Sequence, residues 1–491
     1  MSKLYIFGIG GTGSRVLKSL TMLLAAGVDC GVKTIVPIII DRDTSNQDLT
    51  RTELLIKDYI VVNKIAERTK ENKFFKTKIE LLNNKLLLPL KGDTKTFKDY
   101  IGRNETMNLE NQALVDMLFS NETLDMDMTV GFQGNPNIGS VVLNQFDDND
   151  IFKAFSNDFT DEDSKIFIVS SIFGGTGASG FPLLLKELHN KKENAEKLGL
   201  SNWSKINKAK IGALSVLPYF NVKCSTDNSL VNSDTFHDKA KAALTYYLTL
   251  NKQLDTLYYI GDNTPSTFEH NKGGEAQQNN AHFVELASAL AILDFVNPEK
   301  ENENYHSVSD EPTKVCRNKT TYGEFGINFG QDGSCNIIDF SNFETTKRQL
   351  VEPLSRFLLF RNYMTYVFDK QYNYQPYGYR IGRPAKSLRN KEVIKKMVEV
   401  QAKFYEWLNE MQSDQHNRKF IPFSLSTTNA FDFVLGNTNV IAKPSWSDNI
   451  GYKDWARIDN ELNRQKIKEK FEQEELFLEL FYRTTSNLIK L

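Results

Sequence analysis

The stretch that decides the fold reads Phe173-Gly174-Gly175-Thr176-Gly177-Ala178-Ser179-Gly180. It follows an apolar run over 165–172, which indicates a buried strand. It precedes an apolar run over 181–188, which indicates a helix with Pro182 in its first turn, where a missing N–H costs nothing. Four glycines in seven residues let a ligand approach the backbone, and the N–H groups that open a helix suit a phosphate. Thr176 and Ser179 add hydroxyl donors. The alternative is a tight turn that needs glycine only for packing.

A similar strand, turn and helix opens the chain. An apolar run over 4–7 leads into Gly8-Ile9-Gly10-Gly11-Thr12-Gly13-Ser14, and apolar residues then recur at helical spacing over 16–24. This GxGxxG-like turn occurs in dinucleotide-binding domains and in other nucleotide folds. The next strand, 33–40, ends at Asp41-Arg42-Asp43. A carboxylate at that place contacts a ribose or helps to position a metal, and a helix cap is an equal alternative for Asp43.

The pattern of apolar residues predicts further strands and helices in the rest of the chain. Further strands are expected over 128–132, 211–218 and 257–260, and a helix over 234–254. The segment 279–296 is apolar almost all round and predicts a buried central helix. The Asp-Gly pair in 325–343 predicts a strand–turn–strand segment. Long amphipathic helices are expected in the remaining part, over 344–370, 391–412 and 454–490.

Composition narrows the class of protein. At 491 residues the chain is too long for one ordinary core, which predicts two or three domains. A net charge of −2 gives no support for nucleic-acid binding. The four cysteines form no CxxC pair and the six histidines form no HExxH motif, so a reducing compartment without a metal-site motif is expected. The sequence shows no signal peptide and no apolar run long enough for a membrane span, so a cytoplasmic location is expected.

The order of these loops resembles the tubulin/FtsZ superfamily, and most closely its divergent bacterial tubulin-like members. Gly174–Gly180 is similar to the tubulin signature GGGTGSG, with Phe173 in place of its first glycine. Gly134-Asn135-Pro136-Asn137-Ile138-Gly139 is similar to the FtsZ loop GANPxVG, which approaches the γ-phosphate. The resemblance covers residues 1–296. Residues 344–491 do not resemble the β-rich second domain of that superfamily.

The resemblance implies an α/β fold class. We expect a tubulin-like nucleotide-binding domain over 1–296, with a parallel sheet flanked by helices and the central helix at 279–296. A linker with the strand–turn–strand segment would follow over 297–343. A mainly helical C-terminal domain would occupy 344–491.

The implied ligands are GTP or GDP with Mg²⁺, although nothing in these residues excludes adenine. Gly10, Gly11, Thr12, Gly13 and Ser14 would lie at the α- and β-phosphates. Asn135 would lie near the γ-phosphate, and Asp41 and Asp43 near the metal or ribose. The base and ribose would be bound by Asp262 or Asn263 and by Asn280, with Phe283 either stacking on the base or packing in the core. The second glycine turn would hold the remaining phosphate through Gly174, Gly175, Thr176, Gly177, Ala178, Ser179 and Gly180.

In the superfamily, a neighbouring subunit completes hydrolysis with an acidic residue from an NxDxxE or NxDxxD loop. One matching stretch, 280–285, ends at Glu285 but has His282 in place of the Asp and begins the central helix. The other, 336–344, follows that helix and contains Asp339 and Glu344, but Asn342 replaces the catalytic acid. Chain order favours the second stretch. Because Asn cannot ionise, GTP hydrolysis is expected to be weak or absent unless Asp339 or Glu344 serves instead.

Three functions follow from these observations. The leading one is a GTP-binding protein that assembles into filaments or oligomers, with nucleotide at the subunit interface. The second is a Rossmann oxidoreductase that binds NAD at Gly8–Gly13, which leaves the second glycine turn without a role. The third is a scaffold that binds nucleotide without turnover and recruits a protein partner through the helices at 344–370 and 454–490. Such stripes also pack against their own domain in most proteins.

Overall fold

A six-stranded, all-parallel sheet forms the centre of the molecule, in the order β3-β2-β1-β4-β5-β7. Its strands are β1 (Lys3–Ile9), β2 (Thr34–Ile40), β3 (Lys78–Ile79), β4 (Lys165–Ser171), β5 (Lys210–Val216) and β7 (Thr256–Ile260). The computed structural model describes residues 2–90, 95–132, 134–145, 149–190, 192–223, 236–250, 253–262, 266–269, 274–296, 334–336, 347–412, 419–421, 423, 425, 431 and 455–490.

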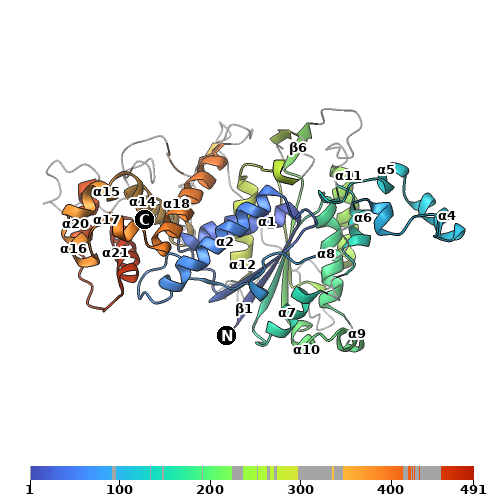
Figure 1. Cartoon of the computed structure of the whole chain (residues 1–491), viewed down its shortest axis with the longest axis horizontal. Helices are drawn as coiled ribbons and strands as arrows, with labels where there is room; N and C mark the ends of the chain where they lie inside the picture. Colours follow the sequence, from blue (N-terminus) through green and yellow to red (C-terminus); the bar gives the residue numbers. More distant parts are fainter. Residues whose placement is uncertain are drawn as a thin grey trace, which may run out of the picture.

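Helices cover both faces of the sheet, which explains why its central strands are mostly apolar and are buried along almost their whole length. The helices α1 (Gly10–Ala25), α2 (Gln47–Ala66) and α12 (Phe283–Val296) pack together on one face. Figure 1 shows α6 (Pro136–Val142), α8 (Gly175–Leu188) and α11 (Phe236–Leu250) on the other face. The chain therefore forms the parallel sheet flanked by helices that its sequence predicts, and α12 is the buried helix expected near 279–296.

The strand order fixes where a ligand site belongs. Numbered along the chain, the strands of the sheet run 3-2-1-4-5-6, so the order reverses between β1 and β4. The helices that follow these two strands, α1 and α8, leave the same sheet edge toward opposite faces (Figure 1). In open parallel sheets, ligands bind in the crevice at such a switch point, beyond the carboxyl ends of the strands.

The C-terminal region is mainly helical and packs beside α2, at the end of the molecule away from α4 (Leu109–Leu118) (Figure 1). Its long helices are α14 (Glu352–Tyr366), α18 (Glu392–Met411), α20 (Trp455–Arg464) and α21 (Gln473–Leu488). Aromatic rings form much of this contact: Phe74 meets Phe357 and Tyr482 at centroid distances of 5.3 and 5.1 Å.

The smaller elements lie around these layers. Two short parallel pairs join β6 (Phe220–Lys223) to β8 (Ser266–Glu269), and β9 (Ser334–Asn336) to β10 (Lys419–Ile421). Within the described ranges, no helix has the length and hydropathy that a bilayer span requires. The remaining α-helices of the described residues are α3 (Phe97–Tyr100), α5 (Asn121–Leu124), α7 (Asp150–Asp158), α9 (Lys192–Lys197), α10 (Trp203–Ile206), α15 (Phe368–Gln371), α16 (Pro376–Ile381) and α17 (Ala385–Arg389).

The prediction for Pro182 was wrong. Helix α8 begins at Gly175, so the glycine stretch is itself the first turn and Pro182 lies inside the helix. Proline cannot donate to the carbonyl four residues earlier, which here belongs to Ala178. The hydroxyl of Tyr247 on α11 donates to that carbonyl oxygen at 3.3 Å. A neighbouring helix thus satisfies the group that proline leaves unpaired.

Two other expectations also fail. The strand expected over 128–132 does not form, because Thr129 and Val130 make a turn and Asp127 closes only an isolated bridge to Thr96. The single helix expected over 454–490 is two helices, α20 and α21, separated by 465–472. Of the strand–turn–strand segment, only 334–336 is described, and it pairs in parallel with β10 rather than with a hairpin partner within the described ranges.

Candidate functional site

The two glycine turns meet at the switch point of the sheet. Gly10 opens α1 with φ +72°, and a Cβ placed on it would lie 3.4 Å from Cβ of Thr176 and 3.7 Å from the backbone N of Gly177. The residues before the two helices, Ile9 and Gly174, provide no side-chain cap. Two helix N-termini therefore lie side by side with uncapped N–H groups, an arrangement that favours an anion.

The glycines of these turns have different tasks. A Cβ on Gly13 would lie 2.4 Å from the carbonyl carbon of Gly8, and one on Gly177 would lie 2.6 Å from the carbonyl oxygen of Ser171. These two positions need glycine because a helix packs against a strand end. A Cβ on Gly11 would meet only Nδ2 of Asn46, at 3.7 Å. Gly11 is thus the position where a missing side chain leaves space for a ligand.

The hydroxyl groups of the turns also differ. Thr176 is half-buried beside Gly10, whereas Thr12 and Ser14 are buried. Oγ of Ser179 donates to the carbonyl oxygen of Gly175 at 2.7 Å, and Gly139 of α6 packs against that side chain. The hydroxyl of Ser179 is thereby used within α8, which does not fit the expectation that it donates to a ligand.

The asparagine–proline loop lies against the second glycine turn. A Cβ on Gly175 would be 3.1 Å from the backbone N of Asn135 and 3.2 Å from that of Gly134. The side chain of Asn135 caps α6 by accepting from the backbone N of Asn137 at 3.2 Å. Lys239 on α11 donates to the carbonyl oxygen of Gly134 at 2.8 Å, and burial lowers the pKa of this lysine. The structure therefore brings Asn135 to the second glycine turn.

The carboxylates expected near metal or ribose follow β2 directly. Burial raises the pKa of Asp41 to about 7, and its Oδ1 accepts from the backbone N of Asp43 at 3.2 Å. Asp43 is also buried; Oδ1 accepts from the Ser45 hydroxyl at 3.0 Å and Oδ2 from the backbone N of Gly274 at 2.8 Å. Asp43 thus connects the end of β2 to the segment that precedes α12. Both of its carboxylate oxygens are used within the chain, so its role here is structural.

The residues expected at the base come from two elements. Asp262 is half-buried just after β7, while Asn280 and Phe283 are half-buried where α12 begins. Phe283 also packs against the core. Asn263, Asp339 and Glu344 lie outside the described residues. Among the side chains that are described, no cluster of three or more His, Cys, Asp or Glu could hold a metal ion.

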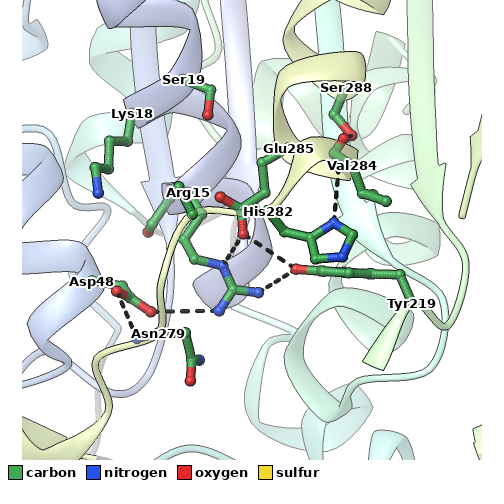
Figure 2. Close-up of polar contacts among 12 residues, drawn as sticks. Arg15, Lys18, Ser19, Asp48, Tyr219, Asn279, His282, Val284, Glu285 and Ser288 are labelled. Atoms are coloured by element: carbon green, nitrogen blue, oxygen red, sulfur yellow. Dashed lines mark hydrogen bonds and ion pairs between the residues drawn. The ribbon is translucent and has the colours of Figure 1, made fainter. Parts of the chain in front are cut away.

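A buried cluster of ionised groups lies beside the start of α12 (Figure 2). Nε of Arg15 on α1 is 2.8 Å from Oε1 of Glu285, and its Nη1 is 3.4 Å from Oδ2 of Asp48. Nη2 of Arg15 donates to the hydroxyl of Tyr219 at 2.5 Å. Burial raises the pKa of Glu285 to about 6, although Arg15 opposes the rise. Glu285 is therefore an internal ion-pair partner in this structure, not an acid exposed to a second subunit.

Sequence reasoning missed the roles of Arg15, Asp48 and Tyr219. A signal was present, because a charged residue in a helix as apolar as α12 needs a buried partner. Arg15 and Lys18 lie on α1, which is buried along almost its whole length, and Glu285 lies on α12. The pattern shows that partners are needed, but not which residues supply them.

Comparisons with known proteins find no matching family model and no matching curated protein. Solved structures with similarity include CetZ2 from Haloferax volcanii, described as a GTPγS-bound protofilament (15% identity, 60% of this chain and 58% of that chain, TM-score 0.28). Others are an FtsZ mutant from M. jannaschii (18%, 53% and 46%, 0.25) and CetZ from Methanosaeta thermophila (15%, 60% and 52%, 0.23). The chain spans about half the length of these structures. Structural similarity this low gives no basis for assigning a function to the chain.

Proposed function

We propose that this chain is a tubulin-like protein that binds a nucleoside triphosphate, GTP by its sequence resemblance, between the two glycine turns. One observation carries the proposal. Two glycine-opened helix N-termini without side-chain caps, those of α1 and α8, adjoin each other at the switch point of a 3-2-1-4-5-6 parallel sheet. A triphosphate has enough charge and length to occupy both N-termini, whereas a single phosphate needs only one.

In this proposal, different groups of the chain bind different parts of the nucleotide. The N–H groups of Gly10–Gly13 and of Gly174–Thr176 bind phosphate oxygens, and the open position at Gly11 admits them. Asn135 lies at the phosphate end, and Asp262, Asn280 and Phe283 lie at the nucleoside end. Mg²⁺, when bound, would neutralise phosphate charge and keep most of its ligands as water and phosphate.

The proposal also covers assembly and hydrolysis. The chain would form filaments or oligomers with nucleotide at the subunit interface. Hydrolysis would be weak, because Asn342 stands where the resemblance places the catalytic acid and Glu285 is occupied by Arg15 and Tyr219 within its own chain. Asp339 and Glu344 remain the acids that the resemblance proposes.

The experiment that tests this function is a direct comparison of ligands on the purified chain. Isothermal titration with GTP, ATP and NAD, each with Mg²⁺, should give binding of GTP, and sedimentation should show larger assemblies with GTP than with GDP. Failure to bind any nucleoside triphosphate would overturn the proposal.

The NAD-binding alternative stays open because two observations favour it. The contact of Gly13 with Gly8, and the position of Asp41 at the end of β2, also occur in the dinucleotide-binding fingerprint. Tight binding of NAD without binding of GTP in the same titration would favour that alternative. The partner-recruiting scaffold loses its main support, because the apolar faces of α14 and α21 are buried against each other within this chain.

A further inference from the structure

Helix α18 of the C-terminal region brings a carboxylate to the start of α12. Oε2 of Glu410, in the last turn of α18, accepts from the backbone N of Ala281 at 3.0 Å. Ala281 follows Asn280 directly and is buried two residues before α12 begins. A residue about 130 positions away in sequence thus holds the segment that carries Asn280.

The same carboxylate also binds two cations of the nucleotide-binding region. Oε2 of Glu410 is 3.1 Å from Nζ of Lys18 on α1, and Oε1 pairs with Arg51 on α2. Burial alone would raise the pKa of Glu410, but Lys18 and Arg51 outweigh it and hold the pKa below its usual range. Glu410 is therefore an ionised carboxylate. The side chains of its two cationic partners, Lys18 and Arg51, are 9% and 15% exposed.

This arrangement continues the cluster of Figure 2. Arg51 also approaches Asp48 at 4.0 Å, and Oδ1 of Asp48 accepts from the backbone N of Asn279 at 3.4 Å. Backbone N–H groups on both sides of Asn280 are thus bound by carboxylates, one from α2 and one from α18. Three cations and three carboxylates share the region, which keeps its charge balanced: Arg15, Lys18, Arg51, Asp48, Glu285 and Glu410.

We propose that Glu410 is a positioning residue for the nucleoside end of the site: it fixes Asn280 through the Ala281 backbone and does not touch the phosphates. The inference rests on the proposed function, since it assigns a task within that same site. It makes the C-terminal helical region part of ligand recognition. Its consequence is that losing Glu410 weakens recognition of base and ribose while the two glycine turns keep their shape.

The test compares two ligands and two glutamates. Affinities for GTP and for inorganic tripolyphosphate are measured on the full chain, on Glu410→Gln and on Glu406→Gln. Glu406 is the matched control, because it lies one turn away on α18, is 56% exposed and approaches Arg51 only at 3.6 Å. We expect Glu410→Gln to weaken GTP binding about tenfold and tripolyphosphate binding less than twofold, and Glu406→Gln to change neither.

A second variant guards against misfolding. Glu410→Gln leaves Lys18 and Arg51 with less counter-charge, so the double variant Lys18→Met with Glu410→Met removes a matched pair. It should show the same selective loss of GTP affinity. Equal loss of both ligands, or unchanged GTP binding in a folded variant, would overturn the role of Glu410. Wild-type protein that binds neither ligand would instead overturn the proposed function, and the inference with it.

Discussion

The two glycine turns are alike in sequence but differ in what surrounds them. The first turn, Gly8–Gly13, needs glycine at Gly13 for packing and leaves Gly11 open. The second turn, Gly174–Gly180, is packed more closely, since Cβ atoms at 174, 175, 177 and 180 would each lie within 3.0 Å of a neighbouring atom. The comparison teaches that the number of glycines in a turn measures close backbone packing as well as ligand approach. Four experiments test or refine this contrast.

The largest effect is expected where glycine serves packing. Gly13→Ala and Gly177→Ala would place a methyl group 2.4 Å from Gly8 and 2.6 Å from the Ser171 carbonyl, both backbone atoms that cannot move aside. We expect each change to lower the free energy of unfolding by about 3 kcal/mol or more. Urea denaturation measures the loss. Gly11→Ala is the control and should be neutral or slightly stabilising, because alanine favours a helix over glycine.

A large loss of binding without a loss of stability is expected at Gly11. Gly11→Leu fills the open position beside Asn46 and blocks the approach of phosphate to the start of α1. GTP affinity should fall about 100-fold, equivalent to about 2.7 kcal/mol, while the urea midpoint stays within experimental error. Normal GTP binding by this variant would show that the first turn is not a ligand contact.

An effect that depends on pH is expected at Asp41, near the first turn. Its pKa is about 7 in the folded chain and 3.8 ordinarily, so the folded state keeps a proton that the unfolded state loses. This group's stabilisation is complete below pH 4 and is lost as pH rises to 7. Without nucleotide, wild type should lose about 1.4 kcal/mol per pH unit relative to Asp41→Asn over that interval. Parallel stability curves for the two proteins would contradict the expectation.

The smallest effect is expected under the second turn. Tyr247→Phe removes the hydroxyl that donates to the Ala178 carbonyl left unpaired by Pro182. The free energy of unfolding should fall by about 1 kcal/mol. Tyr246→Phe is the matched control, since the neighbouring ring is 52% exposed and should change stability by less than the error of the measurement. Equal results for the two variants would deny the hydrogen bond a role.

Local patterns were enough to predict the main elements. The strands at β1, β2, β4, β5 and β7 are apolar runs bounded by turn residues, and each forms where the pattern indicates. The start of α8 was misplaced because Pro182 looks like a first-turn residue, and Tyr247, 65 positions later, is what permits it inside the helix. The run 128–132 has strand-like composition but forms a turn.

The candidate site could also be predicted only in part, because contacts between distant segments of the chain complete it. The glycine turns are contiguous in sequence, so their residues could be named in advance, and the structure brings Gly10 beside Gly177 and Asn135 beside Gly175. Which glycines face a neighbouring backbone depends on the sheet. The partners of Arg15 lie at positions 48, 219 and 285, and no local pattern links them.

The contact of α18 with α1 and α2 has a consequence for synthesis of the chain. A nascent polypeptide that has reached Val296 already contains all six strands of the central sheet. At that stage Lys18 and Arg51 have no Glu410 to bind, and the backbone beside Asn280 lacks its acceptor. Since domains fold from the N-terminus during translation, the two glycine turns can form early, whereas the backbone beside Asn280 gains its acceptor only after Met411 has left the ribosome.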